Sequence, residues 1–272
     1  LMQWIAKHRY WMLRRLTQIG IIVLYSGANA WGWKVLQGNL GSSLLLGTIP
    51  LADPFAVVQM GFAGVVAGAD ALLGAAIIAA FYALIGGRGF CSWVCPVNMV
   101  SDAANALRRV LRINEAEHKV TLSRNLRYWV LGIALILSAV FGVAAFEFIS
   151  PIGIVSRGLI FGIGFGAAVV AGVFLFDVFG VKNGFCGHLC PLGGWYSLIG
   201  RFSLIRVKHD QEKCTLCMKC KGICPENQVL HMVGKQSGFV AMGECTNCAR
   251  CIEVCDDDAL NFSIRLYKGV NS

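Results

Sequence analysis

Eight of the twelve cysteines stand in two runs near the C-terminus, and the two runs share one spacing. Each run has the pattern C-x2-C-x2-C-x3-C, and the members are Cys214, Cys217, Cys220, Cys224, Cys245, Cys248, Cys251 and Cys255. A [4Fe-4S] cluster needs four thiolates that converge on one small volume, and the first three cysteines of such a run can supply three of them. Structural zinc sites use separated pairs instead. The two runs therefore predict two [4Fe-4S] clusters.

The fourth ligand of each cluster is expected from the other run, because the runs of two-cluster ferredoxins exchange their last cysteine. One predicted cluster is bound by Cys214, Cys217, Cys220 and Cys255. The other is bound by Cys245, Cys248, Cys251 and Cys224. Short apolar stretches flank both runs, as expected of the strands and helical turns of a small α+β fold. We therefore predict a two-cluster, bacterial ferredoxin-like domain at residues 204–272.

The remaining cysteines form a second repeated motif, G-F-C-x3-C-P, at Cys91, Cys95, Cys186 and Cys190. In a helical segment this spacing places both sulfurs of a pair on one face. Two thiolates cannot complete a cluster, so our first hypothesis is that the two pairs meet and share a further iron-sulfur centre. The alternatives are two redox-active dithiols, a site for another soft metal such as copper, and structural packing.

The rest of the chain is rich in apolar residues. The sequence is 56% hydrophobic and only 14% charged. Four apolar blocks, near residues 16–36, 63–86, 128–148 and 158–181, approach the roughly 20 residues that a helix needs to cross a bilayer. We therefore expect an α-helical membrane protein, with four transmembrane helices in residues 1–203.

These four blocks form two repeats. In each repeat an apolar block, an X-Pro turn, a second block and a cysteine motif follow one another, and the order recurs after about 95 residues. The turns are Asp53-Pro54 and Ser150-Pro151. Because each repeat contains two expected spans, the repeats should have the same orientation and be related as parallel repeats.

The net charge of +9 does not indicate nucleic-acid binding, because the Lys and Arg residues gather beside the apolar blocks and form no single stripe. They precede the first block, lie between the second and third, and follow the fourth. Such an excess marks the cytoplasmic side of a membrane. We therefore expect both termini and the ferredoxin-like domain in the cytoplasm, where the reducing environment favours metal ligation over disulfides.

Both cysteine motifs in one chain of four apolar blocks resemble the NapH-type membrane component of the quinol dehydrogenase of periplasmic nitrate reductase systems. The resemblance extends to a broader polyferredoxin group with MauN-like and NosR-like proteins. It implies a multi-pass protein of the bacterial cytoplasmic membrane, with quinol as substrate. It also implies a NapG-like periplasmic iron-sulfur protein and a multihaem cytochrome as partners.

The expected function is that of an electron-transfer subunit of a quinol dehydrogenase. Asp53 and Glu147 lie near the two X-Pro turns and are weak candidates to accept quinol protons; no other catalytic residue is predicted. Quinol oxidation by this chain and oxidation at a site contributed by a partner are both open. The alternative function is a redox maturation factor that reduces or delivers a metal or cofactor during assembly of another enzyme.

Overall fold

The computed structural model describes residues 7–113, 122–162 and 164–265, and its residues form two compact units. The first unit comprises Leu1–Thr17, Ala80–Val94 and Tyr196–Ser272. The second comprises Gln18–Ala79 and Cys95–Trp195. The predicted domain boundary between residues 203 and 204 stays a prediction, and residues 1–6, 114–121, 163 and 266–272 of the two predicted domains lie outside the described residues.

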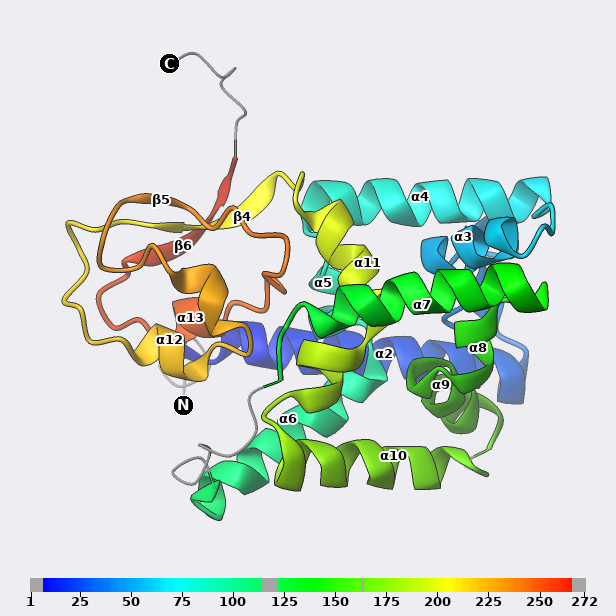
Figure 1. Ribbon diagram of the computed structural model, residues 1–272, viewed down its shortest axis with the longest axis horizontal. Coiled ribbons are helices and arrows are strands. Elements are labelled where there is room, and N and C mark those ends of the chain that lie inside the picture. The colour runs from blue at the N-terminus through cyan, green and yellow to red at the C-terminus, as the bar shows by residue number, and fades with distance from the viewer. Residues whose placement is uncertain (1–6, 114–121, 163, 266–272) are drawn as a thin grey trace. The chain divides into compact units, whose positions relative to one another are not determined.

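The first unit contains a small antiparallel sheet in the order β5-β4-β6. Its strands are β4 (Ile205–His209), β5 (Gly238–Phe239) and β6 (Leu260–Ile264). Its short helices are α5 (Gly89–Trp93), α12 (Lys219–Ile223), η4 (Asn227–Leu230) and α13 (Arg250–Glu253). Helices α12 and α13 pack against each other and lie on the same side of the sheet (Figure 1).

The core of this unit lies between the sheet and the two cysteine runs. Val207 of β4 and Leu260 of β6 are both 1% exposed, and they pack in one cluster with Cys220 and Cys251. The alternation of side chains along a strand directs these apolar residues to one face of the sheet. The same apolar residues therefore cover one face of the sheet and pack against the cysteines.

The second unit is mainly helical and has a three-stranded antiparallel sheet in the order β1-β2-β3. The strands are β1 (Leu36–Gly38), β2 (Ser42–Leu45) and β3 (Ile49–Ala52). The helices within it are α3 (Pro54–Phe62), α6 (Pro96–Val110), α7 (Leu126–Phe141), α8 (Ala145–Ile149), α9 (Pro151–Phe161), α10 (Gly166–Leu175), η2 (Phe176–Gly180) and η3 (Phe185–Leu189). Helices α2 (Arg9–Trp31), α4 (Ala69–Ile85) and α11 (Pro191–Gly200) contribute residues to both units.

The two X-Pro turns begin helices in the same way. Asp53 caps α3 by accepting a hydrogen bond from the backbone N–H of Phe55, and Ser150 caps α9 by accepting one from Gly153. Proline follows each cap, at the first helical position, where its missing N–H has no partner to lose. The repeated sequence pattern therefore repeats a local structure.

The prediction of four transmembrane helices is wrong for the described residues: none of their helices is both long enough and apolar enough to cross a membrane. Helix α4 is the part of the expected 63–86 span that is helical, and its 17 residues reach only about 25 Å. A hydrocarbon core is roughly 30 Å thick. The expected span at 16–36 falls on α2, which begins earlier and carries Arg14 and Arg15.

Interruptions of the helical backbone explain why the two later expected spans are not continuous helices. Helix α7 ends at Phe141 because Gly142 takes a left-handed conformation with φ +64°, so the expected 128–148 span is interrupted. Helix α9 ends before Gly162, where φ is +130°, and a π-helix follows α10 from Phe176. Residue 163 of the expected 158–181 span lies outside the described residues. Composition identified the apolar stretches but not these interruptions.

Candidate iron-sulfur centres

The two C-x2-C-x2-C loops share an unusual backbone. Leu216 and Met218 in the first loop, and Asn247 and Ala249 in the second, all have positive φ angles between 48° and 61°. Left-handed backbone costs an L-residue roughly 1–2 kcal/mol, so it persists only where the surrounding structure requires it. In both loops a left-handed residue directly precedes a helix. Left-handed residues that alternate with other residues can form a concavity of backbone N–H groups that suits an anionic group.

Hydrogen bonds to sulfur occur within these loops and just after the first of them. The backbone N–H groups of Asn247 and Lys221 donate to the thiols of Cys245 and Cys220. The backbone N–H of Glu226 donates to the thiol of Cys224. Hydrogen bonds to sulfur are among the features by which a protein tunes an iron-sulfur cluster. The loops are therefore shaped to hold thiolate sulfur.

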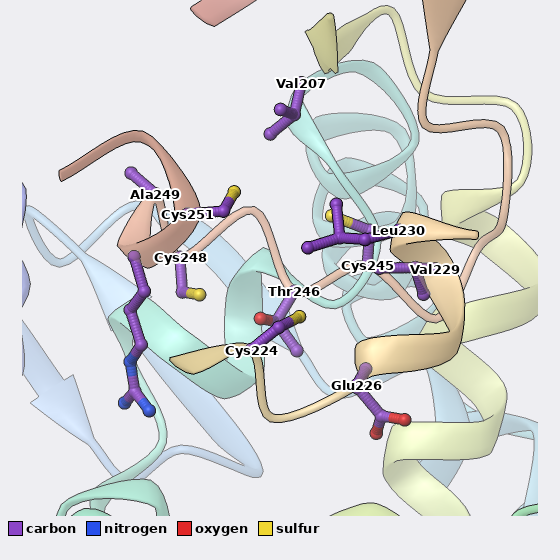
Figure 2. Close-up of a pocket in the computed structure, with 11 residues that line it drawn as sticks. Val207, Cys224, Glu226, Val229, Leu230, Cys245, Thr246, Cys248, Ala249 and Cys251 are labelled. Carbon is purple, nitrogen blue, oxygen red and sulfur yellow. The ribbon is translucent and has the colours of Figure 1, made fainter. Parts of the chain in front are cut away.

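Four cysteines line one cavity of about 360 Å³ of atom-free space, part of which is open to solvent. They are Cys224, Cys245, Cys248 and Cys251. Their sulfur atoms surround the same space, and they come from two separate segments of the chain (Figure 2). Most of the remaining lining is apolar, with Val207, Val229 and Leu230.

A second cavity, of about 310 Å³, is lined by the other four cysteines of the runs. They are Cys214, Cys217, Cys220 and Cys255. Each cavity thus contains three cysteines of one run and the last cysteine of the other. Four thiols around one space, with backbone N–H groups on the sulfurs, fit a [4Fe-4S] cluster. Ligation by these eight cysteines stays a prediction.

Single metal ions require a tighter arrangement than a cluster. Within residues 7–113, 122–162 and 164–265, no three His, Cys, Asp or Glu side chains are grouped so that they could hold one ion. A cluster differs because each of its thiolates binds a different iron atom.

Burial raises the pKa of at least one thiol in each cavity. Cys251 has a pKa well above its ordinary value because of burial first and then the negative charge of Cys248. Burial likewise raises the pKa of Cys224 and of Cys220. Because a cluster needs thiolates, iron binding must displace these protons. Burial therefore favours the neutral form of Cys220, Cys224 and Cys251 until positive metal charge enters.

Helix α5 and the residues before it contact the second cysteine loop. Ser92 Oγ donates to the carbonyl of Thr246 at 2.6 Å, and Trp93 Nε1 donates to the carbonyl of Asn247 at 3.1 Å. Arg88 forms an ion pair with Glu226 at 2.6 Å. Burial alone would lower the pKa of Arg88, but the negative charges of Glu226 and Cys91 raise it by a larger amount. The pKa of Arg88 therefore lies above its ordinary value, and the guanidinium stays charged. Neither Arg88 nor Glu226 was predicted as a site residue from the sequence, although an acidic residue two positions after the fourth cysteine recurs as Asp257.

The four cysteines of the G-F-C-x3-C-P motifs are divided between the units. Cys91 belongs to the first unit, and Cys95, Cys186 and Cys190 belong to the second. Cys186 Sγ lies 3.4 Å from Ser101 Oγ, and burial, followed by the charges of Cys95, Asp177 and Cys190, raises its pKa well above the ordinary value. The shared iron-sulfur or redox site stays a prediction.

Asp53 and Glu147 lie near each other in the second unit. Burial raises the pKa of Asp53 to about 7, and the charge of Glu147 contributes to this rise. Burial also raises the pKa of Glu147, while the charge of Arg157 lowers it. A carboxyl group with a pKa near 7 can exchange a proton at neutral pH. The structure thus brings together two carboxyl groups that are separated by almost a hundred residues.

Comparison with known proteins agrees with an iron-sulfur assignment. A family described as "4Fe-4S binding domain" matches residues 67–114 and 159–209, which contain both G-F-C-x3-C-P motifs. A family described as "4Fe-4S dicluster domain" matches residues 206–256, which contain both four-cysteine runs. No solved structure matches the chain.

Relatives of two names match almost the whole chain. The ferredoxin-type protein NapH of Escherichia coli is 39% identical over 99% of this chain and 94% of its own length. NapH of Haemophilus influenzae is 41% identical over 96% of this chain and 92% of its own. The methylamine utilization ferredoxin-type protein MauN of Methylorubrum extorquens is 42% identical over 95% of this chain and 90% of its own.

Proposed function

Because the chain belongs to the family of NapH and MauN ferredoxin-type proteins, we propose that it is the electron-transfer subunit of a quinol dehydrogenase. The predicted family is confirmed, and the chain is an iron-sulfur electron-transfer protein. The observation that carries the proposal is the pair of cavities with four cysteines each. These cavities would hold two [4Fe-4S] clusters, which supply one-electron chemistry.

Quinol oxidation releases two electrons and two protons, so the protein needs proton acceptors as well as electron acceptors. We assign the protons to Asp53 and Glu147. A pKa of about 7 allows Asp53 to be ionised in a fraction of molecules at neutral pH and then to receive a proton. Glu147 lies close enough for its charge to influence Asp53, so a proton on either group favours ionisation of the other.

A third iron-sulfur centre at Cys91, Cys95, Cys186 and Cys190 is part of the proposal. It is supported by the match of the 4Fe-4S binding domain family to the segments that carry these cysteines. Within the second unit, Cys95 and Cys190 lie close enough to Cys186 for their charges to raise its pKa, which also supports the third centre. Such a centre would add an electron-transfer step between quinol and the two clusters.

Quinol dissolves in lipid, so we place the site of action at the bacterial cytoplasmic membrane, with both termini and the ferredoxin-like domain on the cytoplasmic side. Large apolar side chains exposed on α7, including Trp129, Ile136 and Val140, support contact with lipid. The proposed acceptors are a NapG-like periplasmic iron-sulfur protein and a multihaem cytochrome of a nitrate reductase pathway.

A second candidate function follows from the MauN relatives, which are as similar to this chain as the NapH relatives. In that candidate the same electrons serve a maturation step of a methylamine-utilization pathway, in which a metal or cofactor of another enzyme is reduced or delivered. The two candidates differ in the electron donor and in the partner. They share the two cavities.

The deciding experiment uses the full chain, purified anaerobically with its native partners. Reduced quinol is added, and cluster reduction is followed by electron paramagnetic resonance (EPR). Signals of reduced clusters and release of two protons per quinol are expected. Clusters that dithionite reduces but quinol does not would contradict the dehydrogenase function, and identification of the co-purified partner would then decide whether the maturation function holds.

A further inference from the structure

The two cysteine runs each have an acidic residue two positions after the fourth cysteine. These residues are Glu226, after Cys224, and Asp257, after Cys255. Each lines the cavity that contains its neighbouring cysteine. Because the fourth cysteine of each run must meet three cysteines of the other run, these acidic residues stand where two separate segments have to be held together.

Asp257 makes this connection directly. Its Oδ2 accepts hydrogen bonds from the backbone N–H of Thr215 at 3.2 Å and from Thr215 Oγ1 at 2.6 Å. Thr215 follows Cys214, so the bonds join the segment of Cys255 to the start of the loop that provides its three partners. These contacts are exposed to solvent.

Glu226 makes the corresponding connection through a third residue. Arg88 Nη1 lies 2.6 Å from Glu226 Oε1 and also donates to the carbonyl of Glu244 at 3.0 Å. Glu244 directly precedes Cys245, which begins the loop of the three partner cysteines. Arg88, from the segment before α5, thereby joins the segment of Cys224 to the start of the second loop.

The two connections differ in their burial. The side chains of Arg88 and Glu226 are only 2% and 3% exposed, whereas the Thr215 and Asp257 bonds are at the surface. Charges in a poorly solvated site act strongly on their surroundings, while water and salt screen charges at the surface. A buried ion pair also leaves an uncompensated charge when one partner is removed.

The connection extends to a predicted ligand. The backbone N–H of Glu226 donates to the thiol of Cys224, so Arg88 acts on this cysteine through a single residue. Ser92 and Trp93 hold the same α5 segment against Thr246 and Asn247 of the second loop. The segment that carries Arg88 is therefore attached to the loop at several points.

We propose that Arg88 is a positioning residue for one of the two clusters of the cysteine runs, and that the charge balance between Arg88 and Glu226 sets the reduction potential of that cluster and not of the other. The cluster concerned is the one bound by Cys224, Cys245, Cys248 and Cys251. The inference rests on the proposed presence of two clusters. Reduction adds one negative charge to the cluster, so a neighbouring charge changes its free energy with a predictable sign.

The sign differs between the two partners. Glu226→Gln removes a negative charge beside the cluster and keeps the positive charge of Arg88, which favours reduction and raises the potential. Arg88→Gln leaves the carboxylate of Glu226, which disfavours reduction and lowers the potential. Arg88→Lys keeps the positive charge and should leave the potential near that of the wild type. A purely structural role predicts no such opposition.

The experiment is an EPR-monitored redox titration of the anaerobically purified full chain. The variants are Glu226→Gln, Arg88→Gln and Arg88→Lys, and the matched control is Asp257→Asn. We expect the equilibrium constant for reduction of one cluster to change at least tenfold, in opposite directions in the two Gln variants, which is about 59 mV for a one-electron couple. The other cluster should change less than tenfold in every variant, and the Asp257→Asn control should leave both clusters within this limit.

Shifts in the same direction, equal shifts of both clusters, or no shift above tenfold would overturn the inference. If Arg88→Gln fails to retain the cluster, the comparison of Glu226→Gln with Arg88→Lys still decides the sign. A wild-type chain without two clusters would instead refute the proposed function, so the two failures are distinguishable by iron content.

Discussion

The substitution Asp53→Asn removes the ionisable carboxyl group of Asp53 but keeps a side chain that can cap helix α3. Asp53 caps α3 through the bond from Phe55 N–H, and asparagine caps helices about as well as aspartate. Only the ionisable group is lost. The pKa of Asp53 is raised from 3.8 to about 7 in the folded chain, mainly by burial.

This rise determines how stability depends on pH. Below about pH 4 the carboxyl group is protonated in both the folded and the unfolded chain, and it contributes no difference. Between pH 4 and 7 the unfolded chain releases the proton while the folded chain retains it, so folding becomes less favourable. Each step of one in pKa corresponds to about 1.4 kcal/mol, so the full penalty above pH 7 is about 4 kcal/mol.

We therefore expect Asp53→Asn to be more stable than the wild type above pH 7, by up to about 4 kcal/mol. This figure already includes the favourable interaction between the carboxylate and the N-terminus of α3, because the backbone hydrogen bonds from Phe55 and Ala56 lower the pKa. The difference between the two proteins should disappear near pH 4. Denaturant unfolding at a series of pH values measures it, and infrared titration of the carboxyl band measures the pKa itself.

Asp70→Asn is the matched control, because Asp70 is an exposed aspartate in the first turn of α4. Asp70→Asn removes a carboxyl group that is not buried, so it should give no comparable gain in stability above pH 7. Equal pH dependence in Asp53→Asn and the wild type would refute the argument, because it would show that the carboxyl group titrates alike in the folded and unfolded chain.

Three further predictions concern other parts of the chain. Glu147→Gln removes a negative charge near Asp53 and should lower the pKa of Asp53, which infrared titration detects; an unchanged pKa would contradict their proximity. Gly87→Ala should destabilise the first unit by about 1–3 kcal/mol or more, because its Cβ would overlap the backbone of Tyr196 and Gly200, whereas Gly89→Ala has room and serves as the control in thermal unfolding. Cys186→Ser and Cys91→Ser should each remove about four irons per chain if the third centre exists, and about eight irons in every sample would exclude that centre.

The cysteine spacing determined much of the chemistry without tertiary information. A ligand loop such as Cys245–Cys251 is short, so its residue spacing already limits where three sulfurs can lie. The same spacing predicted which run supplies the fourth cysteine, and the cavities contain these sets. The family could be recognised for the same reason, since its motifs are local.

Composition was a poorer guide to the helices. The apolar stretches predicted four spans. Composition does not reveal where a glycine such as Gly142 or Gly162 takes a positive φ angle and ends a helix. Helix length depends on such single positions. The average hydrophobicity of a window is insensitive to them.

Only the tertiary structure decided which distant residues meet. Arg88 and Glu226 are 138 residues apart, and no sequence motif links the two residues. Asp53 and Glu147 were chosen for their turns, yet their mutual influence and the pKa of about 7 depend on burial in the folded chain. Burial and long-range charge pairing arise from packing, so residue type and spacing cannot specify them, whereas a ligand loop of seven residues carries its geometry in its own sequence.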